Sequence, residues 1–246
     1  YSIMVNSSSC LSNALVSQFD YSQLIETDEY QKGFFSIHDL SSQIMVELLA
    51  PDPGEKIIDI GCGSGGKTLM MAQMMKNQGC IYAVDIHPEK LKTLETHARR
   101  QGIDIIRPLI ADATQPLPKE LRGAHRIFVD APCSGEGMFR KDNAAIAEWS
   151  SQNVELCAAR QKDILTDVWD ALKPGGFLVY STCTYNEHEN EENIKWAAEA
   201  FDAEIILPDT AEFPEIMRTE AGCRFYPHKV VGEGFFISVL RKSNDE

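Results

Sequence analysis

A strand, a glycine-rich turn and a helix follow one another near the start of the strongly patterned part of the chain. The strand is the apolar run Lys-Ile-Ile-Asp-Ile at 56–60, and the turn is Gly-Cys-Gly-Ser-Gly-Gly at 61–66. A Met-rich stretch with helical spacing follows from Lys67 to about Gln78. Glycines in such a turn let the backbone bend sharply and approach a bound group closely. The segment therefore predicts an α/β fold with a ligand site at the end of this strand.

Strands and helices alternate along most of the remaining chain. Further strands are expected at 80–84, 103–110, 126–129, 176–180, 204–207 and 234–240, and further helices at 88–101, 151–172 and 186–201. The last of these helices is expected to open at a capping box formed by Asn186 and Glu189. The alternation predicts a doubly wound, mostly parallel sheet of seven strands, which is a Rossmann-like arrangement.

The glycine turn fits two ligand-binding motifs and one purely structural role. As Gly-x-Gly-x-x-Gly after a strand it is typical of a dinucleotide loop, with Asp85 at the end of the next strand placed to bond ribose hydroxyls. As Gly-x-x-x-x-Gly-Lys-Thr, from Gly61 to Thr68, it also matches a Walker A loop, and Asp130 would then serve as the acidic Walker B residue. A tight turn without any ligand is the third interpretation.

Three carboxylates favour S-adenosylmethionine over a triphosphate as the ligand. Asp59 lies inside the first strand, two residues before the glycine turn, and Asp85 and Asp112 follow the next two strands. The side chains of Asp85 and Asp112 are expected to hold the ribose and the adenine amino group. Because the sulfonium and ammonium groups of S-adenosylmethionine are positive, carboxylates attract this cofactor, whereas they would repel a triphosphate.

Two cysteine-bearing segments carry the chemistry predicted for this chain. The first is Asp-Ala-Pro-Cys-Ser-Gly-Glu-Gly at 130–137 and the second is Ser-Thr-Cys-Thr-Tyr at 181–185, each directly after a predicted strand. Since the carboxyl ends of parallel strands line one crevice, Cys133, Cys183 and Asp130 are expected to converge. Two thiols and a carboxylate suit covalent attack on an electron-poor ring and later release. The alternative is that both thiols are buried packing residues, as free cysteines usually are.

Together these segments resemble the Nop/Sun family of RNA cytosine-5 methyltransferases over residues 33–242. Besides the cysteine segments, the resemblance rests on Arg-Lys-Asp at 140–142, Glu-Asn-Glu at 189–191 and Gly-Glu-Gly-Phe-Phe at 232–236. The glycine turn departs from the family's usual Ala-Ala-Pro-Gly type loop and is typical of S-adenosylmethionine-dependent methyltransferases in general. The resemblance implies a class I methyltransferase domain at 36–242. It also implies a short appendage at 1–35, with residues 2–6 as the remnant of a strand from a larger RNA-binding region.

The resemblance implies a role for each candidate site residue. Cys183 is the expected nucleophile that adds to carbon 6 of cytosine, and Cys133 is expected to assist loss of the carbon-5 proton or release of the product. Asp130 is expected to hydrogen-bond the base at N3 and at the exocyclic amine. Cys133 remains the rival nucleophile, because DNA cytosine methyltransferases attack with the cysteine of a Pro-Cys pair. The cofactor is expected to contact Gly61, Cys62, Gly63, Ser64, Gly65, Gly66, Lys67, Asp85, Asp112 and Asp130.

The resulting hypothesis is an enzyme that transfers a methyl group from S-adenosylmethionine to carbon 5 of a cytosine in RNA, with ribosomal RNA as the expected substrate. A transfer RNA methyltransferase, a P-loop nucleotide hydrolase and an inactive RNA-binding assembly factor remain alternatives. The formal net charge of −14 argues against nonspecific binding to nucleic acid, so a narrow basic patch that recognises a folded particle is expected. Candidate RNA contacts are Arg140, Lys141, Arg160, Lys162, Arg224, Tyr226 and His228.

The cysteines and the hydropathy of the sequence indicate in which compartment the protein is expected. The chain has seven cysteines, with no Cys-x-x-Cys pair and no Cys/His spacing suited to zinc, so no metal site is expected. An odd number of thiols without a secretory signal is typical of a reducing compartment, and a cytoplasmic location is expected. No apolar stretch of the sequence is long enough to span a membrane.

Overall fold

The computed structural model describes residues 5–7, 14–17, 19–211, 213–230, 232 and 234–244. Near the start, β1 (Val5–Ser7) pairs antiparallel with β2 (Leu15–Ser17), and two short helices follow, α1 (Tyr21–Ile25) and α2 (Asp28–Gln31). The strand remnant expected at residues 2–6 lies partly outside the described residues, which begin at Val5.

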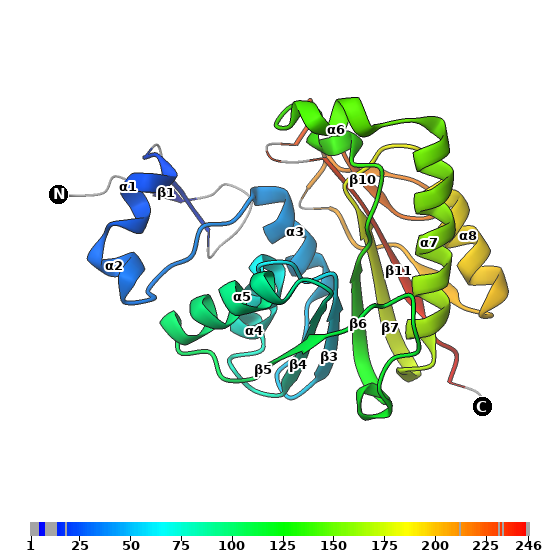
Figure 1. Cartoon of the computed structure of the whole chain (residues 1–246), viewed down its shortest axis with the longest axis horizontal. Coiled ribbons are helices and arrows are strands. Elements are labelled where there is room, and N and C mark those ends of the chain that lie inside the picture. Colours follow the sequence, from blue (N-terminus) through cyan, green and yellow to red (C-terminus); the bar gives the residue numbers. More distant parts are fainter. Residues whose placement is uncertain are drawn as a thin grey trace.

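In the described part of the chain, a nine-stranded sheet forms the centre of the structure (Figure 1). Its strands are β3 (Lys56–Ile60), β4 (Cys80–Asp85), β5 (Ile106–Ile110), β6 (Ala124–Asp130), β7 (Leu172–Thr182), β8 (Glu204–Ile206), β9 (Met217–Arg218), β10 (Cys223–Phe225) and β11 (Phe235–Arg241). Strands β5-β4-β3-β6-β7 run parallel in that order, β11 joins β7 antiparallel, and β8 and β10 both pair with β11. The mostly parallel α/β arrangement is confirmed. The sheet exceeds the seven expected strands because β9 and β10 are too short to give a sequence pattern.

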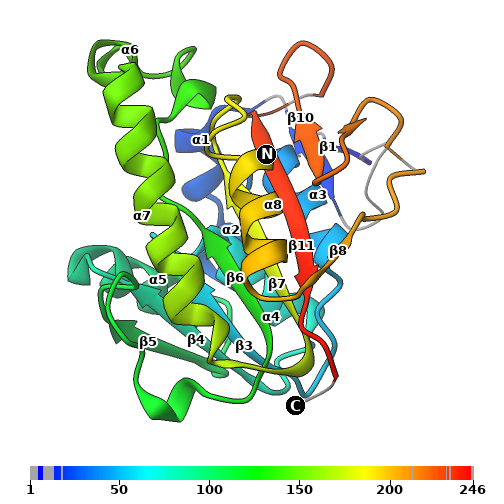
Figure 2. The ribbon, with the colours of Figure 1, turned by 90° about the vertical axis from the view of Figure 1, so that its right-hand side faces the viewer.

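Helices cover both faces of this sheet (Figures 1 and 2). The first face carries α3 (Leu40–Leu49), α4 (Gly66–Met74) and α5 (Pro88–Arg100), and the second carries α7 (Ser151–Trp169) and α8 (Glu191–Ala200). The helix α6 (Asn143–Glu148) and the 3₁₀ turns η1 (Lys119–Leu121) and η2 (Glu136–Met138) lie in the connections. Ile57 packs in the core of the first face and Ile58 in that of the second. Because β3 is buried on both faces, its sequence is a nearly continuous apolar run.

The boundary between α7 and β7 differs from the sequence expectation. The helix ends at Trp169 and the strand already begins at Leu172, so Pro174 and the two glycines after it lie inside the strand. The pairing of β6 with β7 shifts register between Ala124 and Arg126. This irregularity accommodates a proline and two glycines, which would otherwise interrupt a regular ladder.

The start of α8 also differs from the expectation. Asn186 and Glu189 do bond each other, because the Glu189 N–H donates to Asn186 Oδ1 at 2.9 Å and Asn186 Nδ2 donates to Glu189 Oε1 at 2.7 Å. The helix nevertheless begins at Glu191, with Asn190 at its N-cap position. The prediction that α8 begins at this pair of residues is therefore wrong. The Glu189 carboxylate instead also bonds other segments of the chain.

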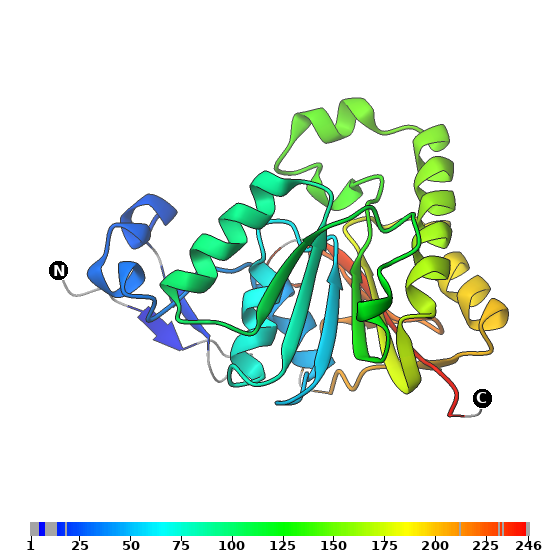
Figure 3. The same ribbon diagram turned by 60° about the horizontal axis from the view of Figure 1, so that its bottom comes forward.

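The part of the chain from α2 to Phe35 lies against the end of α5 (Figure 3). The guanidinium of Arg100 lies 3.8 Å from the ring centroid of Tyr30 and donates to the backbone oxygens of Tyr30 and Phe35. A β-carbon on Gly33 would overlap the backbone oxygen of Arg100, so the chain passes very close to the end of α5 there.

Among the described helices, none combines the length and the apolar character needed to cross a membrane. The described side chains also include no group of three or more His, Cys, Asp or Glu arranged to hold a metal ion.

Candidate active site

The glycine turn joins the carboxyl end of β3 to α4 through three glycines in the left-handed region. Gly61, Gly63 and Gly65 have φ angles of 72°, 56° and 87°. A β-carbon on Gly61 would lie 2.4 Å from the backbone oxygen of Asp130, so β3 and β6 approach each other closely at this point. Apart from Gly63 and its two neighbours in the chain, no heavy atom of the described residues lies within 4 Å of a β-carbon built on Gly63. The turn is therefore tightly packed on one side and open on the other, as an exposed backbone site for a ligand requires.

The other members of the turn differ in what their side chains contact. The Cys62 side chain packs against the core of the first face, and burial raises the pKa of its thiol. Ser64 is exposed. The half-buried ring of His38 approaches the turn, with Nδ1 at 3.7 Å from a β-carbon built on Gly66, and burial lowers the pKa of His38 to about 4. The Cys62 thiol is therefore part of the core and faces away from the open side of the turn.

Asp85 and Asp112 lie at the carboxyl ends of the neighbouring strands β4 and β5, as expected. The Asp85 carboxylate accepts hydrogen bonds from the N–H groups of Gly63 and His87, both at 2.9 Å. It thereby ties the glycine turn to the start of α5. Asp112 bonds within its own turn, where the N–H and the hydroxyl of Thr114 donate to it at 2.9 and 2.7 Å. These bonds lower the pKa of Asp112, so this exposed carboxylate keeps its negative charge.

Asp59 is buried inside β3, with only 1% of its surface exposed. The hydroxyl of Thr68 donates to Asp59 Oδ2 at 2.5 Å, whereas Oδ1 has no hydrogen-bond partner among the described residues. Burial raises the pKa of Asp59 to about 7, although the Thr68 hydroxyl and the Lys67 ammonium lower it. Because an unpaired buried acceptor is costly, the site suits a positively charged group beside Asp59.

Lys67 and Asp130 form an ion pair between the glycine turn and the end of β6. Their Nζ and Oδ2 atoms lie 2.6 Å apart, and the hydroxyl of Ser181 donates to Asp130 Oδ1 at 3.1 Å. Burial lowers the pKa of Lys67, but Asp130 and Asp59 more than offset this and leave it above its ordinary value. A Walker A loop would offer its lysine and threonine to phosphate and Mg²⁺. Here the carboxylates already occupy Lys67 and Thr68, so the geometry disfavours a triphosphate.

Cys133 and Cys183 converge as expected, with their sulfur atoms 3.0 Å apart. Both are half-buried free thiols, and the pairing of Asp130 with Ser181 in adjacent parallel strands brings their segments together. The N–H of Gly137 donates to the backbone oxygen of Cys183 at 2.8 Å, and a β-carbon on Gly137 would lie at the same distance from that oxygen. Glycine at this position therefore lets the two cysteine segments meet closely.

The two thiols have unequal surroundings. The hydrogen bond from Cys133 lowers the pKa of Cys183, and Lys67 acts in the same direction, while burial and Asp130 oppose them. The same hydrogen bond, together with burial and the negative charges of Cys183 and Glu189, raises the pKa of Cys133. These opposite directions favour Cys183 as the thiol of the pair that ionises first.

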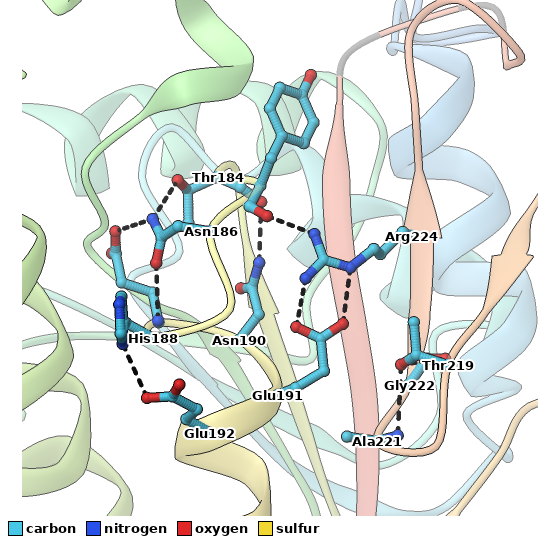
Figure 4. Close-up of polar contacts among 12 residues, drawn as sticks. Thr184, Asn186, His188, Asn190, Glu191, Glu192, Thr219, Ala221, Gly222 and Arg224 are labelled. Atoms are coloured by element: carbon cyan, nitrogen blue, oxygen red, sulfur yellow. Dashed lines mark hydrogen bonds and ion pairs between the residues drawn. The ribbon is translucent and has the colours of Figure 1, made fainter.

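Buried polar side chains hold the segment that follows Cys183 (Figure 4). Asn190 Nδ2 donates to the backbone oxygen of Thr184 at 3.1 Å, and Thr182 Oγ1 donates to Asn190 Oδ1 at 2.6 Å. Asn186 Nδ2 donates to Thr184 Oγ1 at 3.0 Å. Since these bonds lie on both sides of Cys183 in the sequence, they fix the backbone that carries its thiol.

Arg224 is buried in an ion pair, so its expected contact with RNA is wrong. Only 4% of its surface is exposed, and its guanidinium donates to both carboxylate oxygens of Glu191 and to the backbone oxygen of Tyr185 (Figure 4). The rings of Tyr226 and His228, also candidate RNA contacts, lie with centroids 5.5 Å apart, and His228 is exposed. A single cationic residue in the sequence does not reveal a buried partner 33 positions away.

Sequence reasoning missed the side chains that join the two cysteine segments. The Glu189 carboxylate accepts from the N–H of Ser134 at 3.0 Å and from Gln161 Nε2 at 2.7 Å. Glu136 accepts from the N–H of Tyr185 at 2.8 Å. Glu136 and Glu189 both lie in motifs quoted from the sequence, but their bonding partners lie tens of residues apart and share no pattern.

Known proteins with similar sequences are described as ribosomal RNA methyltransferases. The ribosomal RNA small subunit methyltransferase F of Cronobacter sakazakii is 35% identical over 226 residues, which cover 88% of this chain and 46% of that protein. The human 28S rRNA (cytosine(4447)-C(5))-methyltransferase is 35% identical over 234 residues, which cover 88% of this chain and 28% of that protein. The chain therefore spans about half or less of the length of these relatives.

Solved structures from Pyrococcus horikoshii share the fold. NSun6, described with SFG, has a TM-score of 0.75 and 31% identity over 90% of this chain and 56% of its own. A methyltransferase homolog has a TM-score of 0.83 and 28% identity over 98% of this chain and 78% of its own. Both confirm the Rossmann-like methyltransferase fold. The family model for the 16S rRNA methyltransferase RsmB/F matches residues 46–241, and the chain accordingly belongs to this family, as the cysteine segments predicted.

Proposed function

We propose that this chain is an S-adenosylmethionine-dependent enzyme that methylates carbon 5 of a cytosine in RNA, with ribosomal RNA as its substrate. The observation that carries the proposal is the pair of thiols of Cys133 and Cys183, 3.0 Å apart and beside the ion pair of Lys67 and Asp130. The assignment of ribosomal RNA rests on the names of the relatives. The catalytic domain comprises residues 36–242, which include the matched range 46–241.

The glycine turn and the carboxylates around it suit S-adenosylmethionine, which supplies the methyl group when bound. Asp59 Oδ1 is a buried acceptor without a donor, so it fits the positive end of such a cofactor. The segment from Gly61 to Lys67 would hold the cofactor against α4, and Asp85 and Asp112 would bond its ribose and adenine amino group. The open side of Gly63 leaves room for this approach.

Cys183 acts as the nucleophile in the proposed reaction. Its lowered pKa provides a thiolate, which attacks carbon 6 of the cytosine and forms a carbon–sulfur bond. The electron pair of the bond between carbons 5 and 6 moves to carbon 5, which then becomes nucleophilic enough to take a methyl group. Asp130, held by Lys67 and Ser181, accepts from the exocyclic amine of the base and, in the adduct, from N3 once N3 has taken a proton from water. The target base is reached outside its stack.

Cys133 acts after methylation. Its sulfur lies 3.0 Å from that of Cys183, and the hydrogen bond with Cys183, burial and the negative charge of Cys183 raise its pKa in the free enzyme. Once the sulfur of Cys183 is bonded to carbon 6, that charge is gone and Cys133 can lose its proton to water. The Cys133 thiolate then accepts the proton of carbon 5, the double bond reforms, and Cys183 leaves as a thiolate.

The alternatives differ in how well the geometry supports them. A P-loop hydrolase is disfavoured, because carboxylates occupy both Lys67 and Thr68. An inactive assembly factor would not need two half-buried thiols 3.0 Å apart. A transfer RNA substrate remains an outcome of the experiment below.

Calorimetric titration with S-adenosylmethionine, and with Mg-ATP in parallel, tests the cofactor. Binding of the first near micromolar, about 8 kcal/mol, with no heat from the second is expected. Labelled methyl transfer is then measured to a 16S rRNA transcript and to unmodified transfer RNA, with wild-type protein and Cys183→Ala. Methylation of the rRNA by the wild type alone supports the proposal. Transfer to transfer RNA alone would contradict the substrate, and ATP binding alone would contradict the cofactor.

A further inference from the structure

The proposed reaction does not use the carboxylate of Glu189, although this group contacts both thiol-bearing segments. Glu189 is fully buried, with 0% of its surface exposed. It accepts from the N–H of Ser134, the residue after Cys133, at 3.0 Å, and from Nδ2 of Asn186, three residues after Cys183, at 2.7 Å. One carboxylate therefore links the two segments whose thiols meet.

Gln161 of α7 extends this link to the other side of Cys133. Its Nε2 donates to Glu189 at 2.7 Å and to the backbone oxygen of Pro132 at 2.9 Å. The peptide groups before and after Cys133 are thus both held, one by Gln161 and one by Glu189. Every group bonded to the Glu189 carboxylate is an N–H donor, which is what an ionised, acceptor-only carboxylate requires.

Charged groups of opposite sign act on the two thiols. Besides their mutual hydrogen bond, which has the largest effect on both pKa values, the Lys67 ammonium lowers the pKa of Cys183 and the Glu189 carboxylate raises the pKa of Cys133. A negative charge near Cys133 makes a thiolate there unfavourable. The titratable groups that interact with the pair or with its near neighbours are Lys67 from α4, Asp130 at the end of β6, Cys157 and Arg160 from α7, Tyr180 from β7, Tyr185 and Glu189.

We propose that Glu189 is a positioning residue that holds Cys133 against Cys183 and keeps the shared proton of the pair on Cys133. The attacking thiolate then forms on Cys183 alone, and Cys133 becomes a stronger base once its turn comes to accept the carbon-5 proton. This inference rests on the proposed function for the roles of the two thiols. The difference in reactivity between the Cys133 and Cys183 thiols is a property of the free protein and is measured without RNA or cofactor.

The test is the initial rate of iodoacetamide alkylation of each cysteine, followed by peptide mass spectrometry between pH 6 and 9 on the full chain. In the wild type, Cys183 is expected to react first. Glu189→Gln removes the charge and turns an amide N–H towards the surrounding donors, so the ratio of Cys133 to Cys183 alkylation rates at pH 7 should rise severalfold. The matched control is Glu192→Gln in α8, whose exposed carboxylate pairs with His188 and should leave the ratio unchanged.

A second variant separates charge from packing. Gln161→Leu removes a donor to Glu189 and to Pro132 but keeps the carboxylate, so Cys183 should still react first. An unchanged ratio in Glu189→Gln with a native circular-dichroism spectrum would overturn the proposal. Loss of selectivity in Gln161→Leu would do so as well, and this variant decides if Glu189→Gln fails to fold. Failure of RNA methylation with the expected thiol asymmetry would contradict the proposed function and leave this inference intact.

Discussion

The ion pair of Glu191 and Arg224 gives the sharpest prediction on stability. Glu191→Gln leaves the Arg224 guanidinium buried without a counter-charge, at a side-chain exposure of 5%. Removal of one partner from such a pair costs about 3–5 kcal/mol. At about 2–4 °C per kcal/mol for a chain of this size, the midpoint of thermal unfolding should fall by about 6–20 °C.

Urea unfolding followed by circular dichroism measures the same loss at fixed temperature. The control is Glu220→Gln, which breaks the exposed pair with Lys195 by the same chemical change and should leave the midpoint unaltered. The double variant with Arg224→Met should be more stable than Glu191→Gln alone, because no unpaired charge remains buried. Equal urea midpoints for Glu191→Gln and Glu220→Gln would refute the argument that burial makes the ion pair of Glu191 and Arg224 important for stability.

Three further predictions concern the site. Burial raises the pKa of Asp59 to about 7, and a bound cation would lower it, so S-adenosylmethionine binding should release a proton near pH 6.5. The affinity for the cofactor should then increase towards pH 7, by at most about tenfold per pH unit. Calorimetry in buffers of different ionisation enthalpy measures the proton release, and its absence would refute the prediction. Gly61→Ala should destabilise the fold by more than about 1–3 kcal/mol, because a clash with the backbone of Asp130 adds to the left-handed strain. The control Gly54→Ala carries the same strain, but no described atom outside its chain neighbours lies within 4 Å of the new β-carbon, and equal urea midpoints for the two variants would contradict the argument. Cys133→Ala should accumulate a covalent RNA complex on denaturing gels, and absence of that complex would refute its late role.

The strand, turn and helix around Gly61 were predictable because their signals are local. Apolar runs set β3 and β4, the spacing of glycines set the turn, and the strand ends placed Asp85 next to it. The meeting of Cys133 and Cys183 followed from the topology of a parallel sheet, in which adjacent strands end at one edge.

What could not be predicted depends on contacts between distant residues. Arg224 looked like a surface cation because nothing beside it in the sequence reveals Glu191. The motif containing Asn186 and Glu189 resembled a helix start, but the buried carboxylate bonds Ser134 and Gln161 instead, and α8 begins later. Such side chains are specified by tertiary packing, which no local period encodes.

The central claim is that Cys183 forms a covalent bond with cytosine during methyl transfer. We would incubate the protein and S-adenosylmethionine with a 16S rRNA transcript that contains 5-fluorocytidine, because fluorine cannot leave carbon 5 as a proton does. Nuclease digestion and peptide mass spectrometry then locate the trapped nucleotide. The account predicts a methylated fluorocytidine adduct on Cys183, absent from Cys183→Ala. An adduct on Cys133 in the wild-type protein would contradict it.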